Sequence, residues 1–333
     1  MELDRGVKEE AGVKRGGWGR GGRTSISLTV NQSRDRLAME WMGGVMDKAL
    51  GPGAIGIKGM GLEEAIGLAR EAGFDALTFD VREAAGLAAE RGMDAVRELF
   101  TAAGVRPGSW NVPVGWRQGD DWEAELRGLP ALAAVARELG SDRATSGIWP
   151  GSDERAYEEN FTWHAERLRP IAAALAGEGC RLGLEFIGPK TFRAPFRHEF
   201  ISTLGGVMEM AGAVGTGNVG VLLDAWHLYT SGETVADIAG LTANDVVAVH
   251  VNDAPVGVAR DEQVDNVRTL PMETGVIDLV GFMGALGAIG YDGPVMPEPF
   301  SARLEAVAAN DPVAAAKEAG RAMEELWRAA GLG

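Results

Sequence analysis

Four apolar stretches in the second half of the chain each carry an acidic or histidine side chain near their end. These stretches are RLGLEFIGP (181–189) with Glu185, VGVLLDAWH (219–227) with Asp224, VVAVHVND (246–253) with His250, and GPVMPEPF (293–300) with Glu298. Stretches so rich in Val, Leu and Ile belong in buried strands, where a charged side chain needs a reason to be present. If the strands are neighbours in one parallel sheet, their carboxyl ends bring the four side chains into one small volume.

The rest of the chain alternates between short apolar runs and segments with helical spacing. Strands are predicted at 54–57, 74–81, 105–114, 142–151, 181–187, 219–225, 246–252 and 294–300. Helices are predicted at 62–72, 82–103, 122–139, 154–176, 198–214, 234–241, 277–289 and 311–330, and a short helix over 39–50 is expected to close the bottom of the barrel. Eight strand–helix units predict an α/β fold, a TIM (β/α)8 barrel, with its active site at the carboxyl ends of the strands. A doubly wound sheet would need a break in the alternation that the sequence does not show.

Residues 1–38 differ from the remainder of the chain, because they are rich in Gly and Arg and have no hydrophobic period. They are predicted to be a disordered N-terminal extension, and residues 39–333 a single catalytic barrel domain. The start lacks the apolar segment of a secretory signal, and no apolar run is long enough to cross a bilayer. Together with a lone Cys180, which cannot form an internal disulfide, this favours a cytoplasmic protein.

The net charge of −16 argues against a nucleic-acid partner, since such proteins need a basic face toward the phosphates. A small neutral substrate fits this charge better than a polyanion. No glycine-rich anion nest stands out, which favours an unphosphorylated substrate. The segment 215–220 fits G-x-G-x-x-G but precedes a strand rather than a helix, so it does not indicate dinucleotide binding.

The four strand-end side chains would make a divalent-metal site if they met. Three carboxylates and one imidazole suit Mn²⁺, Mg²⁺ or Co²⁺, with Mn²⁺ favoured and Zn²⁺ left open. The alternative for each acid taken singly is a helix cap or an ion pair with an arginine. Recurrence at the same place in successive strands favours the metal site over four separate structural roles.

The segments GLEFIGP, LLDAWH, VHVND and TGVIDLVGFMGALGAIGYDGPVMPEPF resemble the sugar phosphate isomerase/epimerase family of xylose isomerase-like TIM barrels. This family includes ketose 3-epimerases, hydroxypyruvate isomerase and inosose-processing enzymes. The resemblance runs from about residue 54 to 300. It implies that Glu185, Asp224, His250 and Glu298 bind the metal and that His227 contacts the substrate. It also implies a substrate-binding Arg after His250, for which Arg268 and Arg260 are the candidates.

Other candidate substrate contacts follow from their positions near strand ends. Lys190 lies just after the fifth predicted strand, and Trp110 and Asn111 end the third. A lysine there can donate hydrogen bonds to a substrate, and a Trp can form a wall for a sugar ring. A solvated loop charge for Lys190 and ordinary core packing for Trp110 are the structural alternatives.

The predicted function is metal-dependent isomerisation or epimerisation of a small sugar or polyol ketone. A divalent cation would stabilise an enediolate, while Glu185 and Glu298 remove and return protons beside the carbonyl. One alternative is a lyase on the same site, either an inosose dehydratase or an enzyme that cleaves 3-oxo-glycosides. Another is a non-catalytic barrel subunit. A homo-oligomer is compatible with the sequence, which does not fix the oligomeric state.

Overall fold

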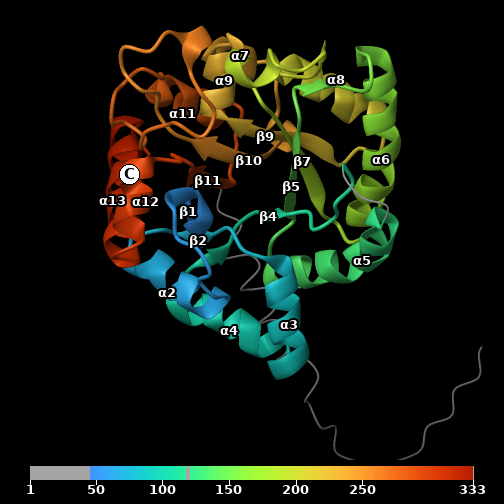
Figure 1. The fold of residues 1–333 in the computed structure, drawn as a ribbon. Coiled ribbons are helices and arrows are strands. Elements are labelled where there is room, and N and C mark those ends of the chain that lie inside the picture. Colours follow the sequence, from blue (N-terminus) through green and yellow to red (C-terminus); the bar gives the residue numbers. More distant parts are fainter. Residues whose placement is uncertain (1–45, 118–120, 333) are drawn as a thin grey trace, which may run out of the picture. The chain divides into compact units, whose positions relative to one another are not determined.

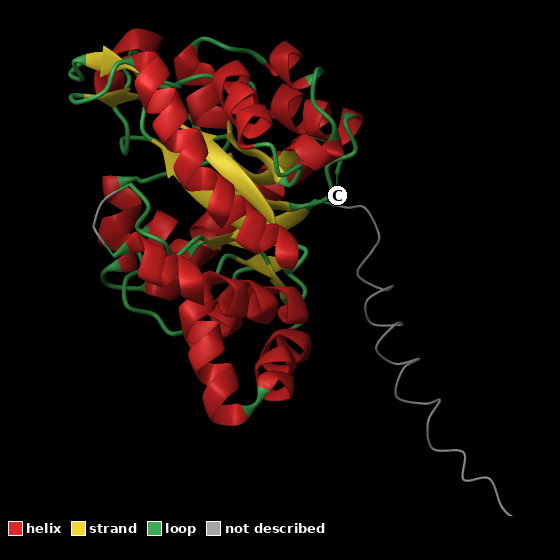
Figure 2. Ribbon diagram, turned by 90° about the vertical axis from the view of Figure 1, so that its right-hand side faces the viewer, coloured by secondary structure: helices red, strands yellow, loops and turns green. Residues whose placement is uncertain are grey.

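The computed structural model describes residues 46–117 and 121–332, which belong to a compact unit spanning Gly44–Gly333. The predicted extension over 1–38 lies outside the described residues. The unit contains one sheet in which every strand pairing is parallel (Figures 1 and 2). In order of pairing its strands are β3 (Arg106–Pro107), β2 (Ala76–Leu77), β1 (Asp47–Leu50), β11 (Pro294–Pro297), β10 (Val246–Val251), β9 (Val219–Asp224), β7 (Arg181–Phe186), β5 (Arg143–Ile148) and β4 (Trp110–Asn111).

The two ends of this strand order are halves of one extended segment, so the sheet closes into a barrel. β3 pairs with β2 and β4 pairs with β5, and only Gly108 and Ser109 separate β3 from β4. At this junction the Gly108 N–H donates a hydrogen bond to the carbonyl of Leu77. A Cβ at residue 108 would lie 2.9 Å from that same oxygen, so the close approach requires glycine. The TIM (β/α)8 barrel predicted from the sequence is confirmed.

Helices pack on the outside of the sheet, as Figure 1 shows. They are α2 (Leu62–Glu71), α3 (Val81–Arg91), α4 (Met93–Ala103), α5 (Trp122–Leu139), α6 (Tyr157–Gly177), α7 (Lys190–Arg193), α8 (Leu204–Val214), α9 (Ala225–Ser231), α10 (Val235–Ile238), α11 (Leu279–Ala288), α12 (Ala302–Ala308) and α13 (Pro312–Ala329). Three 3-10 turns accompany them, η1 (Pro52–Ile55), η2 (Ala243–Asp245) and η3 (Arg260–Glu262), and the strands β6 (Gly151–Ser152) and β8 (His198–Glu199) form a separate antiparallel pair.

The first strand of the barrel was placed wrongly by the sequence. The predicted strand over 54–57 lies in and just after η1, where Pro52 and the surrounding glycines favour a turn. The barrel strand is instead β1, within the segment predicted as a helix over 39–50, of which residues 39–45 lie outside the described part. The sequence of β1, DKAL, hides its strand character because two charged residues open it. Asp47 pairs with Arg106 and Lys48 pairs with Glu324, so both charges are accommodated.

Two helical predictions also need correction, and some short helices were missed. The single helix over 82–103 is two helices, α3 and α4, because Gly92 has a φ of +86° and interrupts the hydrogen-bonded ladder. The helix predicted over 198–214 begins only at Leu204, and His198 lies in β8. The short helices α7, α9 and α12 were not predicted, since each has too few residues to show a helical period.

A cluster of aromatic rings packs beside the carboxyl end of β5. The buried His164 ring lies between Trp116, Trp163 and Phe200, with centroid distances of 5.3, 5.0 and 4.6 Å. Its Nδ1 donates a 2.8 Å hydrogen bond to the Asn160 carbonyl one turn earlier in α6. Burial lowers the pKa of the His164 ring to about 4, because the apolar rings around it cannot solvate a charge. His164 is therefore a neutral packing residue at pH 7.

The packing of α13 against the segment after α2 generates a first prediction. A Cβ at the buried Gly320 would lie 2.1 Å from the Ala72 carbonyl oxygen, whereas a Cβ at the exposed Gly284 of α11 would meet nothing within 4 Å. Gly320→Ala should therefore lower the free energy of unfolding by about 1–3 kcal/mol through overpacking. Gly284→Ala, the matched control, should raise it by about 0.5–1 kcal/mol. Urea unfolding measures both, and equal effects of the two substitutions would contradict the packing.

The neutral state of His164 generates a second prediction. Between pH 6.5 and 4 the ring takes up a proton in the unfolded chain but not in the folded protein, so stability rises with pH in this window. At pH 5 this residue should cost about 2 kcal/mol of unfolding free energy relative to pH 7.5. His164→Gln, which does not titrate, should reduce the pH dependence of urea unfolding by that amount. An unchanged pH dependence in this variant would contradict the assignment.

Candidate metal centre

The four predicted ligand residues come together at the carboxyl ends of adjacent strands. Glu185 is in β7, Asp224 ends β9, His250 is in β10, and Glu298 follows β11 directly. These strands are neighbours in the sheet, and in the ladder His250 lies opposite Asp224. One ligand atom from each side chain lies within 4.8 Å of the ligand atoms of the other three. The convergence follows from the barrel, because parallel strands end at the same rim.

Two buried atoms in this cluster have no hydrogen-bond partner. The Nδ1 atom of His250 lies 3.4 Å from Oε1 of Glu185 and 3.4 Å from Oε2 of Glu298, but bonds to neither. Oε1 of Glu185 is likewise buried and unbonded. Buried polar atoms normally find partners, so a nitrogen facing two carboxylates at equal distance marks a place for a cation. The donor set fits a divalent ion with hard oxygen ligands and one imidazole.

Asp224 is the most enclosed of the four and has a fixed orientation. Its Oδ1 accepts hydrogen bonds from the Trp226 N–H at 2.7 Å and the Asn252 amide at 3.3 Å. Its Oδ2 accepts a 2.9 Å bond from Nη1 of Arg268. The Trp226 contact also caps the first turn of α9, which places that helix directly after the strand. Asp224 therefore supplies a carboxylate whose geometry is set before any ligand arrives.

The charges of the cluster keep the carboxylates of Asp224 and Glu298 ionised. Burial raises the pKa of the Asp224 carboxyl, but the Arg268 guanidinium and the neighbouring histidines together hold that pKa below its ordinary value. Burial also raises the pKa of Glu298, but His250 and Arg268 together hold that pKa below its ordinary value. Burial lowers the pKa of the His250 ring, but the carboxylates of Glu298 and Glu185 raise it well above its ordinary value. An ion bound through Nδ1 would displace the proton that this ring otherwise holds.

Arg268 forms hydrogen bonds with two of the predicted metal ligands. Its Nη1 bonds both Asp224 and Glu298, at 2.9 and 3.0 Å to the carboxylate oxygens, and its Nη2 bonds Asp265 at 2.8 Å. Its side chain is 2% exposed and lies over the rings of Trp226 and Phe300. The other arginine candidate, Arg260, lies in η3. The sequence identified Arg268 as a candidate, but it did not predict that Arg268 would bond the carboxylates of Asp224 and Glu298.

The other predicted substrate contacts lie at different depths. His227 is buried, with the Gly188 N–H donating to its Nδ1 at 3.2 Å and Arg268 Nη2 lying 3.2 Å from its Nε2. Lys190 forms an exposed ion pair with Asp261, at 3.0 Å. Trp110 is fully buried in β4, and the exposed Asn111 accepts a 2.9 Å bond from the Thr145 hydroxyl. The structure brings His227 and Arg268 to the cluster, and contact of all five residues with a substrate remains a prediction.

Asn252 and Asp253, which follow His250 closely in the chain, have roles that the sequence did not reveal. Asn252 orients Asp224 through its side-chain amide. Asp253, which directly follows it, accepts hydrogen bonds from the backbone N–H groups of Ala254, Thr274, Gly275 and Ile277. Asp253 thus holds the loop before α11 and does not join the ligand group. The spacing V-H-V-N-D contains both residues, but nothing in it distinguishes a ligand from a loop anchor.

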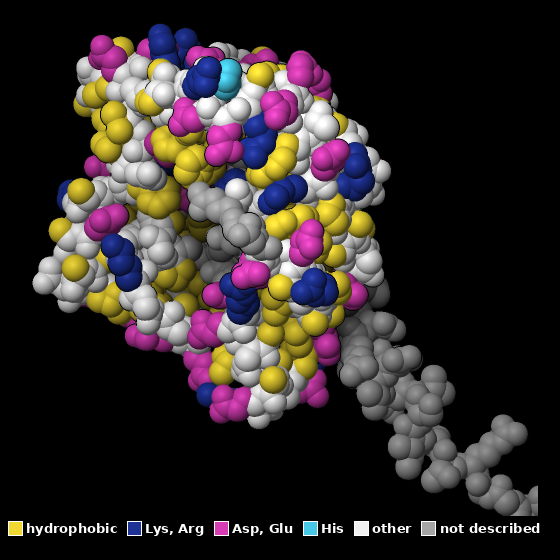
Figure 3. Space-filling model, turned by 45° about the vertical axis from the view of Figure 1, so that its right-hand side comes forward, with side chains coloured by type: hydrophobic (Ala, Val, Ile, Leu, Met, Phe, Trp, Pro, Cys, Tyr) yellow, Lys and Arg dark blue, Asp and Glu magenta, His cyan; other side chains and the backbone are white. Residues whose placement is uncertain are grey.

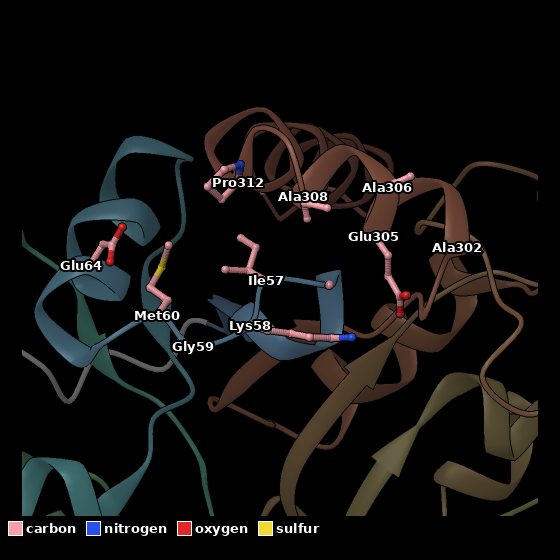
Figure 4. A pocket seen from close by; sticks show the side chains of 12 residues that line it. Ile57, Lys58, Gly59, Met60, Glu64, Ala302, Glu305, Ala306, Ala308 and Pro312 are labelled. Atoms are coloured by element: carbon pink, nitrogen blue, oxygen red, sulfur yellow. The ribbon is translucent and has the colours of Figure 1, made fainter.

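A cleft of about 620 Å³ lies on the same rim, between the loop after β1 and α12. Figure 4 shows Lys58 and Glu305 on its walls, with much of the remaining lining formed by Ala, Gly and Ile57. None of the four ligand residues lines it. On the face shown in Figure 3, Lys and Arg side chains alternate with Asp and Glu, so that view has no broad patch of one charge.

The family model for xylose isomerase-like TIM barrels matches residues 66–326, which is most of the chain. The chain belongs to this family. The resemblance inferred from the strand-end motifs is confirmed. Among the described residues, no helix combines the length and the hydropathy needed to pass through a membrane.

Curated relatives of the chain are named as enzymes. An inosose isomerase of Halalkalibacterium halodurans is 29% identical over 42% of this chain and 46% of that protein. A 3-dehydroshikimate dehydratase of Pseudomonas aeruginosa is 28% identical over 41% of this chain and 20% of that protein. The match thus spans less than half the length of either relative.

Solved structures reproduce the fold over more of the chain. A xylose isomerase domain protein of Alicyclobacillus acidocaldarius has a TM-score of 0.76 and 29% identity, covering 86% of this chain and 100% of that one. The IOLI protein, solved with a bound zinc atom, has a TM-score of 0.67 and 18% identity, covering 86% of this chain and 98% of that one. At 18% identity, the likeness to the IOLI protein shows a shared fold alone.

A third prediction compares Asp224, a proposed metal ligand, with Asp253, which anchors a loop after the neighbouring strand. If the cluster holds one ion, Asp224→Asn should weaken Mn²⁺ binding by more than the roughly 100-fold that the loss of an outer partner costs. Asp253→Asn should keep one Mn²⁺ per chain but lower the free energy of unfolding by about 1–3 kcal/mol, because an NH2 group replaces one of the two oxygens that each accept two backbone N–H bonds. Titration calorimetry and urea unfolding check the two. Equal Mn²⁺ affinities in both variants would contradict the assignment.

Proposed function

We propose that this chain is a divalent-metal-dependent isomerase or epimerase that acts on a sugar or a sugar-like polyol ketone. The observation that carries the proposal is the ligand group itself, in which His250 Nδ1 and Glu185 Oε1 are buried, unbonded and 3.4 Å apart. Membership of the xylose isomerase-like family and the inosose isomerase relative support the reaction class. Mn²⁺ is the proposed ion, because carboxylates predominate among the four ligands.

The chemistry requires a proton to leave a carbon beside a carbonyl group, and such a proton is too weakly acidic for a carboxylate in water. Glu185, Asp224, His250 and Glu298 would hold a divalent cation, which would supply the positive charge that stabilises an enediolate. Glu185 and Glu298 stand on two sides of His250, each 3.4 Å from its Nδ1. We assign these two carboxylates the roles of base and acid, acting on the two faces of the substrate.

The residues around Glu185 and Glu298 include charged groups that act on Glu298 and the proposed substrate contacts. His250 and the Arg268 guanidinium, which bonds Glu298, together hold the pKa of its carboxyl group below the ordinary value, so Glu298 is ionised as a base must be. His227, Trp110, Asn111 and Lys190 remain the proposed substrate contacts, with His227 the one that lies against the cluster. Three of the four ligands sit on barrel strands and Glu298 directly follows one, which favours a fixed reaction geometry.

A second candidate is a lyase that uses the same proton abstraction and then expels a hydroxyl or alkoxide group. The 3-dehydroshikimate dehydratase relative favours this alternative. Product analysis by mass spectrometry separates the two, because elimination of water changes the mass of the product and epimerisation does not. A purified protein that binds no divalent metal would favour the third alternative, a non-catalytic barrel.

The fourth prediction tests the two glutamates. With Mn²⁺ bound, the protein should incorporate deuterium from the solvent into at least one member of a panel of ketoses and inososes. Glu185→Gln and Glu298→Gln should each slow this exchange by about 10²-fold to 10⁴-fold, since an amide cannot take up the proton. The control Glu90→Gln alters an exposed glutamate of α3 and should leave exchange unchanged. Full exchange activity in both site variants would refute the assignment.

A further inference from the structure

We infer that Arg117 binds an anionic group of the substrate, a carboxylate or a phosphate, while the reacting carbon lies at Glu185. This inference rests on the proposed function, and it names the substrate class as an acidic sugar or polyol ketone. It departs from the neutral, unphosphorylated substrate favoured by the net charge, because a local cation and not the whole surface faces the site.

Arg117 is held in place by two indole rings and a backbone carbonyl. Its guanidinium carbon lies 5.4 Å from the centroid of Trp116 and 5.8 Å from that of Trp149. Its Nη1 donates a hydrogen bond to the carbonyl of Gly147 in β5. A guanidinium fixed between aromatic faces loses little further freedom when it binds an anion.

The rings that hold Arg117 are themselves anchored. Trp116 is buried, its indole N–H donates a 3.0 Å bond to the Ser146 hydroxyl, and its carbonyl accepts a 2.7 Å bond from Arg167. Trp149 follows β5 directly and is 43% exposed, so it stands at the catalytic rim. The arginine therefore sits on a rigid wall that opens to solvent beside the ends of the strands.

In the described part of the chain, Arg117 and Arg268 differ in their acidic neighbours. Among residues 46–117 and 121–332, no carboxylate lies within ion-pair distance of its guanidinium, whereas Arg268 pairs with three carboxylates. One N–H of Arg117 is used by the Gly147 carbonyl, and a guanidinium has five N–H donors. The remaining N–H groups form a planar fork of the kind that binds carboxylates and phosphates in a bidentate manner.

Gly147 connects this arginine to the metal centre. In the ladder between β5 and β7, Gly147 lies directly opposite Glu185. A Cβ at residue 147 would lie 3.6 Å from Arg117 Nη1 and 4.0 Å from Glu185 Oε2. The guanidinium and the carboxylate thus border the same small space, which the missing side chain leaves open. A ligand about the size of a hexose can span the two, with its anionic end at Arg117 and its reacting carbon at Glu185.

The test uses Mn²⁺-loaded protein and two sets of matched probes. The first set is D-fructose, D-fructuronate and D-fructose 6-phosphate, which share the ketone and differ at C6. The second is 3-dehydroshikimate and its methyl ester. Binding is measured by titration calorimetry and exchange by deuterium incorporation. In at least one set an anionic member should bind about 10-fold to 100-fold more tightly than its neutral counterpart, as charge-assisted hydrogen bonds predict. Preference for fructuronate or for the phosphate distinguishes the two anions.

Substitutions assign the preference to its residue. Arg117→Gln should bring the ratio of anionic to neutral association constants close to one, and Gly147→Ala should reduce the ratio because its Cβ enters the shared space. The control Arg155→Gln removes an arginine that lies 4.4 Å over Trp163 and pairs with Glu154, and it should leave the ratio unchanged. A ratio near one for the unaltered protein in both sets, or a preference that survives in Arg117→Gln, overturns the inference.

The inference and the proposed function fail in different ways. Deuterium exchange without an Arg117-dependent ratio leaves the isomerase standing and refutes the anion site. An Arg117-dependent ratio without exchange of any probe supports the anion site and counts against the isomerase.

Discussion

The structure depends on balancing several negative charges at the carboxyl ends of the strands of an apolar barrel. Glu185, Asp224 and Glu298 present carboxylates to one small volume, and Asp224 is fully buried. Isolated buried charges are costly, so such a group persists only if cations face it. The Arg268 guanidinium bonds the carboxylates of Asp224 and Glu298. The His250 ring faces those of Glu185 and Glu298. A divalent ion in their midst would complete the same balance.

The loops around this balance carry backbone strain. Asn266, Met272 and Phe300 adopt positive φ values of 61°, 68° and 37°, and none of them is glycine. Two of them flank Arg268 in the chain, and the ring of the third lies 5.1 Å from its guanidinium carbon. Such conformations cost about 1–3 kcal/mol each and persist where the surroundings impose them. The strain therefore coincides with the segment that places the arginine against the ligand group.

The strand ends were predictable because their signal is chemical as well as periodic. An acid that ends a Val- and Leu-rich run is conspicuous, and the barrel rule places its side chain at the rim. β1 was missed for the opposite reason, since DKAL begins with two charges whose partners, Arg106 and Glu324, lie far away in the sequence. Likewise, the segment V-H-V-N-D does not show that Asp253 anchors a loop. Nor does the sequence around Arg117 show that the missing side chain of Gly147 leaves a space between Arg117 and Glu185. These outcomes depend on contacts between distant segments.

The central claim is that one divalent ion binds among Glu185, Asp224, His250 and Glu298. Anomalous X-ray diffraction from a crystal of the protein grown with Mn²⁺ tests it most directly. We expect a single strong peak about 2.0–2.2 Å from one oxygen of each carboxylate and from Nδ1 of His250. An absence of any peak among these side chains, with Mn²⁺ bound elsewhere or not at all, would contradict it.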